Sequence, residues 1–389
     1  MKQPIKNIIR ETHSELVKEP IYTLLIDGTN LLKISFADPK INSNGEHIGG
    51  VFQFLLQVRM LLMKRDWDYV YVFFDDEDSG ILRYEIYNEY KANRDKHYDL
   101  HTNMSEYEKA LNEKIKQMKD YIYNKESKTK KDVDEENFIR EREILMKYFN
   151  ELYIRWMMDK ETEGDDLIAY YVLNKKSEEK IVIVSSDEDF TQLLSNDVYI
   201  YNPRLKKNIT NINFKNEYGY PYTNVLIKKI ICGDKSDNIG NILGVSEKNL
   251  FSLIPEITER EITIDEVKER AFSLNEERKK NKKKPLKYCE NILNSVSSKN
   301  YNGNIYEINE KLINLKKPLL TENARTEIES MMYAPQDPEN RSFKNLYNFI
   351  NEDDIIDLKD SSRFTSFFSP FKKIVDKEIK RYSKEVNLT

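Results

Sequence analysis

Short, unbroken apolar runs dominate the hydrophobic pattern in the first half of the chain. Residues 23–26, 69–74 and 181–184 are mostly aliphatic or aromatic, and polar turn residues follow each run directly. Runs of this length without alternation are typical of strands that are buried on both faces, as in a parallel sheet. Residues 49–64 and 138–149 instead place apolar residues at helical spacing. The pattern predicts an α/β fold with a mainly parallel central sheet flanked by helices.

Each of the three apolar runs ends in carboxylates. Asp27 follows the first run, Asp75 the second, and Asp187 with Asp189 the third. One such aspartate is commonly a turn former or a helix cap, but the carboxyl ends of parallel strands meet at one edge of a sheet, where ligands bind. Carboxylate clusters without His or Cys suit hard cations. We therefore predict a magnesium or manganese site at this edge.

Two later segments add further acids. One begins a predicted helix near residue 164, and its acids are more numerous than capping requires. The other lies between two helical pieces within residues 230–250, where glycines could expose backbone N–H groups to a phosphate. The acids of the two segments are Glu163, Asp165, Asp166, Asp234 and Asp237, and the glycines are Gly240 and Gly244.

Basic residues are concentrated in two places. After Asp75, a helix would place two Arg, one Lys and two Tyr on one face, namely Arg83, Tyr87, Tyr90, Lys91 and Arg94. Such a face can bind phosphates and stack on bases, although a solvated charged face is the alternative on this segment alone. Residues 278–287 hold seven cations. They could follow a DNA backbone or form a solvated loop.

Composition narrows the class of protein. The 389 residues are 39% hydrophobic and 33% charged, with a net charge of −5, which predicts a globular chain. The two cysteines, Cys232 and Cys289, are too few for a disulfide framework or a Cys-rich zinc site. No apolar run reaches the length of a membrane span, and the N-terminus lacks the apolar core of a signal peptide. We expect a cytoplasmic, monomeric protein with no membrane partner.

In combination, five motifs resemble the flap endonuclease and 5′-to-3′ exonuclease family, most closely its phage RNase H branch. They occur in the family's order between residues 22 and about 250, and the chain beyond about residue 256 is only vaguely similar. The motifs are LIDGTN (25–30), FFDD with LRYEIYNEYKANR (73–94), EGDD (163–166), SSDEDFTQLL (185–194) and GDKSDNIGNILGV (233–245). Here EGDD replaces the usual EADD, and Gly-Val-Ser at 244–246 replaces a Gly-x-Gly.

The resemblance implies a PIN-like nuclease core, a helical arch over the active site, and a helix–three-turn–helix element that grips duplex DNA. Gly240, Gly244 and Lys248 would contact DNA together with the tyrosines and cations named above. The expected division is an extension at 1–20, a nuclease domain at 21–230 with the arch at 95–150, a helical DNA-binding domain at 231–340, and C-terminal helices with a Phe-rich tail at 341–389.

The resemblance also implies hydrolysis of phosphodiesters with two divalent ions about 4 Å apart. Lys91 and Arg94 would contact the scissile phosphate, and Arg83 belongs to the same catalytic set. Substrates would be RNA primers on DNA and 5′ flaps in DNA replication. Asp27, Asp75, Glu163 and Asp165 would hold one ion, Asp187, Asp189 and Asp237 the other, and Asp166 and Asp234 complete the acidic set.

Two other functions compete with this interpretation. A non-catalytic replication protein that binds DNA structures would be expected to lack acids, yet no matched acid is missing. A PIN-type ribonuclease would lack the GDKSDN segment. The tail Phe364, Phe367 and Phe368 is similar to sliding-clamp ligands, with Ser361 in place of the usual Gln. It either packs on the body or binds a clamp or single-strand-binding protein. A phage origin would place the protein in the host cytoplasm.

Overall fold

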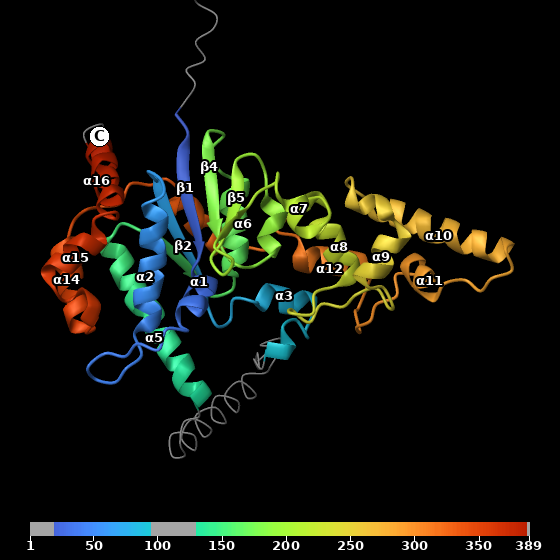
Figure 1. Ribbon diagram of the computed structural model, residues 1–389, viewed down its shortest axis with the longest axis horizontal. Helices are drawn as coiled ribbons and strands as arrows, with labels where there is room; N and C mark the ends of the chain where they lie inside the picture. The colour runs from blue at the N-terminus through green and yellow to red at the C-terminus, as the bar shows by residue number, and fades with distance from the viewer. Residues whose placement is uncertain (1–18, 95–129, 387–389) are drawn as a thin grey trace, which may run out of the picture.

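The computed structural model describes residues 19–94 and 130–386 and is built around one six-stranded sheet (Figure 1). The strand order is β3-β2-β1-β4-β5-β6; β1 to β5 pair in parallel, and β6 is antiparallel to β5. The mainly parallel α/β prediction is confirmed, and the three apolar runs are β1, β2 and β4. The strands are β1 (Ile21–Asp27), β2 (Tyr69–Asp75), β3 (Arg155–Asp159), β4 (Glu179–Val184), β5 (Val198–Asn202) and β6 (Lys207–Ile209).

Helices cover both faces of the sheet. On one face, Leu24, Val72 and Phe74 pack against α2, α5 and the C-terminal helices. On the other, Leu25 and Tyr71 pack against α6 and α13. The first layer comprises α1 (Gly28–Ser35), α2 (Gly49–Leu62), α5 (Lys130–Glu151), α14 (Phe343–Glu352), α15 (Ser361–Phe368) and α16 (Lys372–Val386); the second comprises α6 (Gly164–Leu173), α7 (Phe214–Tyr218) and α13 (Glu322–Met331).

A group of helices with its own apolar core projects from the sheet domain (Figure 1). Ile231, Val245, Val267 and Ile292 are among its buried residues. The group comprises α8 (Val225–Cys232), α9 (Glu247–Leu253), α10 (Ile264–Lys280), α11 (Lys287–Leu293) and α12 (Ile305–Ile313), and α3 (Ile81–Ile86) lies between it and the sheet. Short 3-10 helices occur at Ala92–Arg94, Asp189–Leu193, Tyr222–Asn224, Pro255–Thr258 and Ile356–Leu358.

The packing moves two of the expected boundaries. Leu315, Ala324 and Ile328 belong to the core of the sheet domain, so the chain returns to that domain well before residue 340. Leu145 and Phe149 of α5 are also fully buried in the core, so the second half of α5 is not part of an arch. The remainder of the predicted arch, 95–129, and residues 1–18 lie outside the described residues. None of the described helices has the length and apolar character needed to cross a membrane.

The Phe-rich tail packs on the body of the protein, which is one of the two alternatives that the sequence left open; its binding to a clamp or single-strand-binding protein stays a prediction. Phe364, Phe368 and Phe371 are 8%, 2% and 0% exposed and pack into the core beside α2. The buried ion pair between Arg155 of β3 and Glu378 of α16, with an N–O distance of 2.7 Å, holds the same region to the sheet. Burial of three aromatic rings is therefore what this motif contributes.

Candidate active site

The ends of β1 and β2 hold two carboxylates in fixed orientations. Asp27 is the N-cap of α1: its side chain accepts hydrogen bonds from the Asn30 N–H at 2.9 Å and from the Ser185 hydroxyl at 2.8 Å. The Asp75 carboxylate accepts the Gly164 N–H at 2.8 Å. A Cβ at Gly164 would lie 3.2 Å from Asp75 Oδ1, so glycine lets the start of α6 approach the end of β2 closely.

Asp165 and Asp187 complete a cluster of four carboxylates with Asp27 and Asp75. Asp165 lies in the first turn of α6, and Asp187 follows β4. Burial, together with repulsion by Asp75, raises the pKa of Asp27 to about 7. Burial and the charges of Asp27, Asp187 and Asp75 also raise the pKa of Asp165. The edge of the sheet therefore carries a concentrated negative charge, as the strand pattern predicts.

Glu163 lies next to this cluster but is neutralised by the protein itself. The Lys91 ammonium is 2.5 Å and the Arg83 guanidinium 2.6 Å from its carboxylate oxygens, and the Tyr90 hydroxyl donates to it at 3.2 Å. Burial alone would raise the pKa of Glu163, but the two cations outweigh it and lower the pKa to about 2. The Lys91 N–H also donates to the backbone oxygen of Asp237 at 2.9 Å.

Arg83 and Asp166 form a buried structural pair, which contradicts the predicted roles of both. They are 5% and 1% exposed, and the Arg83 guanidinium contacts both Asp166 oxygens. Arg83 also donates to the Leu312 oxygen at 2.9 Å, and Asp166 accepts the Leu319 N–H at 3.0 Å. Because these groups satisfy each other in the interior, Asp166 does not face the cluster and Arg83 is not available to a phosphate.

The predicted aromatic and basic face after Asp75 is wrong in its tyrosines. Helix α3 ends at Ile86, so the helical spacing does not continue. Tyr87 and Tyr90 are 4% and 2% exposed and pack against apolar residues that include Leu312, where neither ring can stack on a base. Lys91 remains at the rim of a cavity that Asp75 also lines. The side chain of Arg94 lies outside the described residues.

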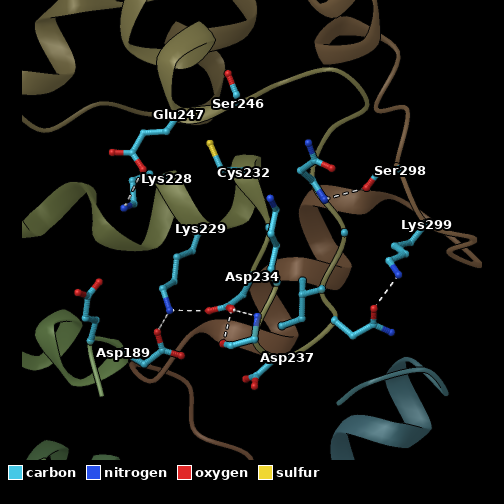
Figure 2. A pocket seen from close by; sticks show the side chains of 18 of the residues that line it. Asp189, Lys228, Lys229, Cys232, Asp234, Asp237, Ser246, Glu247, Ser298 and Lys299 are labelled. Carbon is cyan, nitrogen blue, oxygen red and sulfur yellow. Dashed lines mark hydrogen bonds and ion pairs between the residues drawn. The ribbon is translucent and has the colours of Figure 1, made fainter. Parts of the chain in front are cut away.

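A second group of acids, Asp189, Asp234 and Asp237, lies at the start of the helical region (Figure 2). The Lys229 ammonium, on the last turn of α8, lies 2.8 Å from an Asp234 oxygen and also contacts Asp189. Although burial raises the pKa of Asp234, the charge of Lys229 lowers it to about 2. The Asp237 carboxylate accepts the Tyr90 hydroxyl at 3.3 Å. Figure 2 shows that these side chains converge from separate elements.

A cavity of about 930 Å³ extends from Asp187 along the loop that joins α8 and α9. We call this loop, residues 233–246, the hairpin loop. Gly240 in this loop is buried, and its N–H donates to the Tyr301 hydroxyl at 2.7 Å, so its predicted DNA contact is wrong. Gly244, with a φ of +79°, and Lys248 are exposed, and their DNA contacts stay predictions.

Four residues that were not predicted as site residues hold the acids in place. The Thr29 hydroxyl accepts the Asp75 N–H at 2.7 Å, and the Asn30 side chain accepts the Ser186 N–H at 3.0 Å. Thr29, Asn30 and Ser185 lie in the same strand-end turns as the predicted acids, so their positions in the sequence could have identified them. Lys229 carried no such signal, because one of its partners is 40 residues away.

The oxygen ligands of the acidic cluster suit divalent cations, although they do not form a complete metal site. Among residues 19–94 and 130–386, no three His, Cys, Asp or Glu side chains stand at the spacing of a complete metal site. However, the four clustered groups are all hard oxygen ligands, and their mutual repulsion is the condition that a bound cation relieves. The chemistry of the donor set therefore fits Mg²⁺ or Mn²⁺.

Comparison with known proteins assigns the family. Residues 22–219 match the family model described as 5′-3′ exonuclease, N-terminal resolvase-like domain, and the chain belongs to this family. It is 27% identical over 233 residues to a 5′-3′ exonuclease of Mycoplasmopsis pulmonis, covering 59% of this chain and 65% of that protein. It is 26% identical over 257 residues to DNA polymerase I of Bacillus caldotenax, covering 63% of this chain and 25% of that protein. The chain thus spans less than two thirds of either relative.

Solved structures show the same fold. The bacteriophage T5 D15 flap endonuclease, in a complex with DNA and metal ions, superimposes with a TM-score of 0.54 at 16% identity, covering 92% of this chain and 99% of that chain. The T5 5′-exonuclease with bound zinc gives a TM-score of 0.52 at 17% identity, covering 85% and 98%. The PIN-like flap endonuclease fold that the motifs predicted is therefore confirmed.

Proposed function

We propose that this protein is a divalent-metal-dependent phosphodiesterase that cuts nucleic acids near their 5′ ends, as a 5′-to-3′ exonuclease and flap endonuclease. The observation that carries the proposal is the cluster of Asp27, Asp75, Asp165 and Asp187 at the carboxyl edge of the parallel sheet. Burial and the charges of the neighbouring acids raise the pKa values of two of them, Asp27 and Asp165. Such a surplus of hard oxygen ligands in a cleft is what phosphoryl chemistry with Mg²⁺ requires.

The acids fall into two groups that would hold two ions. Asp27, Asp75 and Asp165, with Glu163 beside them, would hold one ion. Asp187, Asp189, Asp234 and Asp237 would hold the other, where the ion would compete with Lys229 for Asp189 and Asp234. When bound, Mg²⁺ or Mn²⁺ supplies Lewis acidity toward the phosphate and lowers the pKa of water. Glu163 is the least available of these acids, since Lys91 and Arg83 already neutralise it.

The chain's own residues orient the substrate and the ligands. Lys91 is 19% exposed at its side chain and stands at the rim of the cleft, where its ammonium would turn from Glu163 toward the scissile phosphate and stabilise the charge that develops there. Asn30 and Ser185 keep Asp27 oriented through their hydrogen bonds. The hairpin loop lines a separate cavity together with Asp187 and would hold the duplex beside the cleft.

RNA primers on DNA and 5′ flaps are the substrates that this arrangement favours, because the catalytic edge lies directly beside a duplex-binding element. The test is cleavage of three 5′-labelled substrates, with magnesium and with EDTA. The substrates are a 5′-flap duplex, an RNA–DNA hybrid and the free single strand. The proposal predicts magnesium-dependent release of short 5′ products from the first two. Cleavage of the free strand alone, or binding without cleavage in magnesium, would contradict it.

A further inference from the structure

The strongest local concentration of positive charge lies outside the site described above. Residues 278–287, which we call the lysine turn, join α10 to α11 and contain no acidic residue. Six lysines of the turn are exposed: Lys279, Lys280, Lys282, Lys283, Lys284 and Lys287. In a chain whose net charge is −5, this surface differs in sign from the molecule as a whole.

The lysine turn has a defined conformation, which a run of like charges does not adopt by itself. The Lys283 N–H donates to the Arg278 oxygen at 2.8 Å, and Arg278 Nε donates to the Lys284 oxygen at 2.8 Å. Lys282 takes the left-handed conformation, with a φ of +54°, that closes the turn. Asn275, 4% exposed, binds both the N–H and the oxygen of Leu286.

Neighbouring acids do not cancel this charge. Lys279 pairs with Glu276 at 2.7 Å and Lys287 with Glu290 at 3.3 Å, and both are i,i+3 pairs at the surface. Exposed pairs of this kind contribute little and exchange readily with water. The fold therefore uses hydrogen bonds and one buried asparagine to hold several ammonium groups close together. Such an arrangement is unfavourable by itself and becomes favourable beside a polyanion.

The lysine turn is rigidly connected to the hairpin loop. Asn291 of α11 donates to the Leu243 oxygen at 2.7 Å, and the Leu243 N–H donates to the Val296 oxygen at 2.8 Å. Ile242 and Val245 of the hairpin loop share a core with Val267 of α10 and Ile292 of α11. Helices α10 and α11 thus form an arm that starts at the hairpin loop and carries the lysine turn at its far end (Figure 1).

We propose that the lysine turn is a second contact for the phosphate backbone of duplex DNA, beyond the hairpin loop. The inference rests on the proposed function, since it takes the duplex to be held at the hairpin loop. A helix the length of α10 spans about 25 Å, which corresponds to roughly seven base-pair steps of a strand. The contact therefore requires a duplex that continues for at least that distance past the hairpin loop.

The test compares a Lys282→Ala/Lys283→Ala/Lys284→Ala variant of the full chain with a charge-matched control. The control, Lys372→Ala/Lys373→Ala/Lys380→Ala, removes three exposed lysines of α16, at the opposite end of the molecule (Figure 1). Binding of flap substrates is measured with Ca²⁺ over a salt series, and cleavage is measured with Mg²⁺. The downstream duplex has either about 5 base pairs, closed by a short loop so that it stays paired, or about 25 base pairs. The first length is shorter than the arm's reach and the second is longer.

For the long duplex, the turn variant should bind about ten-fold more weakly, and the slope of log K against log salt should fall by up to about 2.7, since each lost phosphate contact removes about 0.9. The short duplex and the α16 control should bind as the wild type does. Equal loss on both duplexes, or on single strands, would overturn the duplex contact, as would no loss at all. If the wild type cleaves no substrate in Mg²⁺, the proposed function fails instead, and the binding data still decide the contact.

Discussion

Replacing Asp27 with Asn should stabilise the protein in the absence of metal. Asp27 is 7% exposed, and burial beside Asp75 raises its pKa from 3.8 to about 7. Because the folded-state pKa is raised, ionising this group costs the folded state free energy. The cost is absent below the unfolded pKa and complete above the folded one. The wild type therefore loses stability as the pH rises from about 4 to about 7.

The pKa change gives the size of the effect. A shift from 3.8 to about 7 corresponds to about 4 kcal/mol of unfolding free energy at neutral pH, because one pKa unit is worth about 1.4 kcal/mol. Asn keeps an oxygen for the Asn30 N–H but presents an amide N–H₂ to the Ser185 hydroxyl, which must rotate to accept. The weaker hydrogen bond between the substituted amide and the Ser185 hydroxyl costs about 1 kcal/mol. A net gain of about 3 kcal/mol remains after that loss.

Urea unfolding in EDTA at pH 5 and pH 7.5 measures this directly. The unfolding free energy of Asp27→Asn should exceed that of the wild type by about 3 kcal/mol at pH 7.5, and the difference should be smaller at pH 5. Added Mg²⁺ should narrow the difference, because a ligand that binds only the folded state stabilises the wild type by mass action. Asp197→Asn, at an exposed carboxylate paired with Lys180, serves as the control and should have little effect. If Asp27→Asn is no more stable than the wild type in EDTA at pH 7.5, burial and the charge of Asp75 do not raise the pKa of Asp27 as described.

Four further substitutions separate neutralising, structural, catalytic and packing roles. Lys229→Met leaves Asp189 and Asp234 without their shared cation and should destabilise the metal-free protein by about 3 kcal/mol. In thermal unfolding, Mg²⁺ should restore part of the lost stability. A loss that Mg²⁺ does not change would count against a role for Lys229 near the metals. Arg83→Met should lower the unfolding free energy by about 3–5 kcal/mol, because it leaves buried carboxylates unpaired, whereas Lys91→Met should mainly reduce the single-turnover cleavage rate. A large loss of stability in Lys91→Met, with only a loss of cleavage in Arg83→Met, would contradict these roles. Phe368→Ala should cost about 3–5 kcal/mol through the cavity it creates, and an unchanged unfolding free energy would restore the exposed-tail interpretation.

The sequence predicted the elements whose signals are local. Buried strands appear as continuous apolar runs, and their ends are marked by the residues that follow, so the pattern alone placed Asp27, Asp75 and Asp187 at one edge of the sheet. The family motifs placed Asp165 beside them. These positions could be predicted because parallel strands bring their carboxyl ends together regardless of their separation in sequence.

What could not be predicted depends on long-range packing. The helical spacing from Arg83 to Tyr90 is real in the sequence, but α3 ends at Ile86 and the tyrosines turn inward against α12. Arg83 and Asp166 are 83 residues apart, so nothing local shows that they pair. The sequence of the tail does not show that Phe368 packs in the core. For the tyrosines, Arg83 and Asp166, a binding or catalytic role was assigned to side chains for which the tertiary structure provides buried partners.

The most direct test of the central claim is an Asp187→Asn comparison on a labelled 5′-flap duplex, with cleavage followed in Mg²⁺ and binding followed in Ca²⁺. If the sheet-edge carboxylates form the catalytic site, the variant should bind the flap about as tightly as the wild type and lose cleavage by about 100-fold or more, the scale on which groups that stabilise transition-state charge act. Cleavage by Asp187→Asn at the wild-type rate, with intact binding, would show that the chemistry takes place elsewhere.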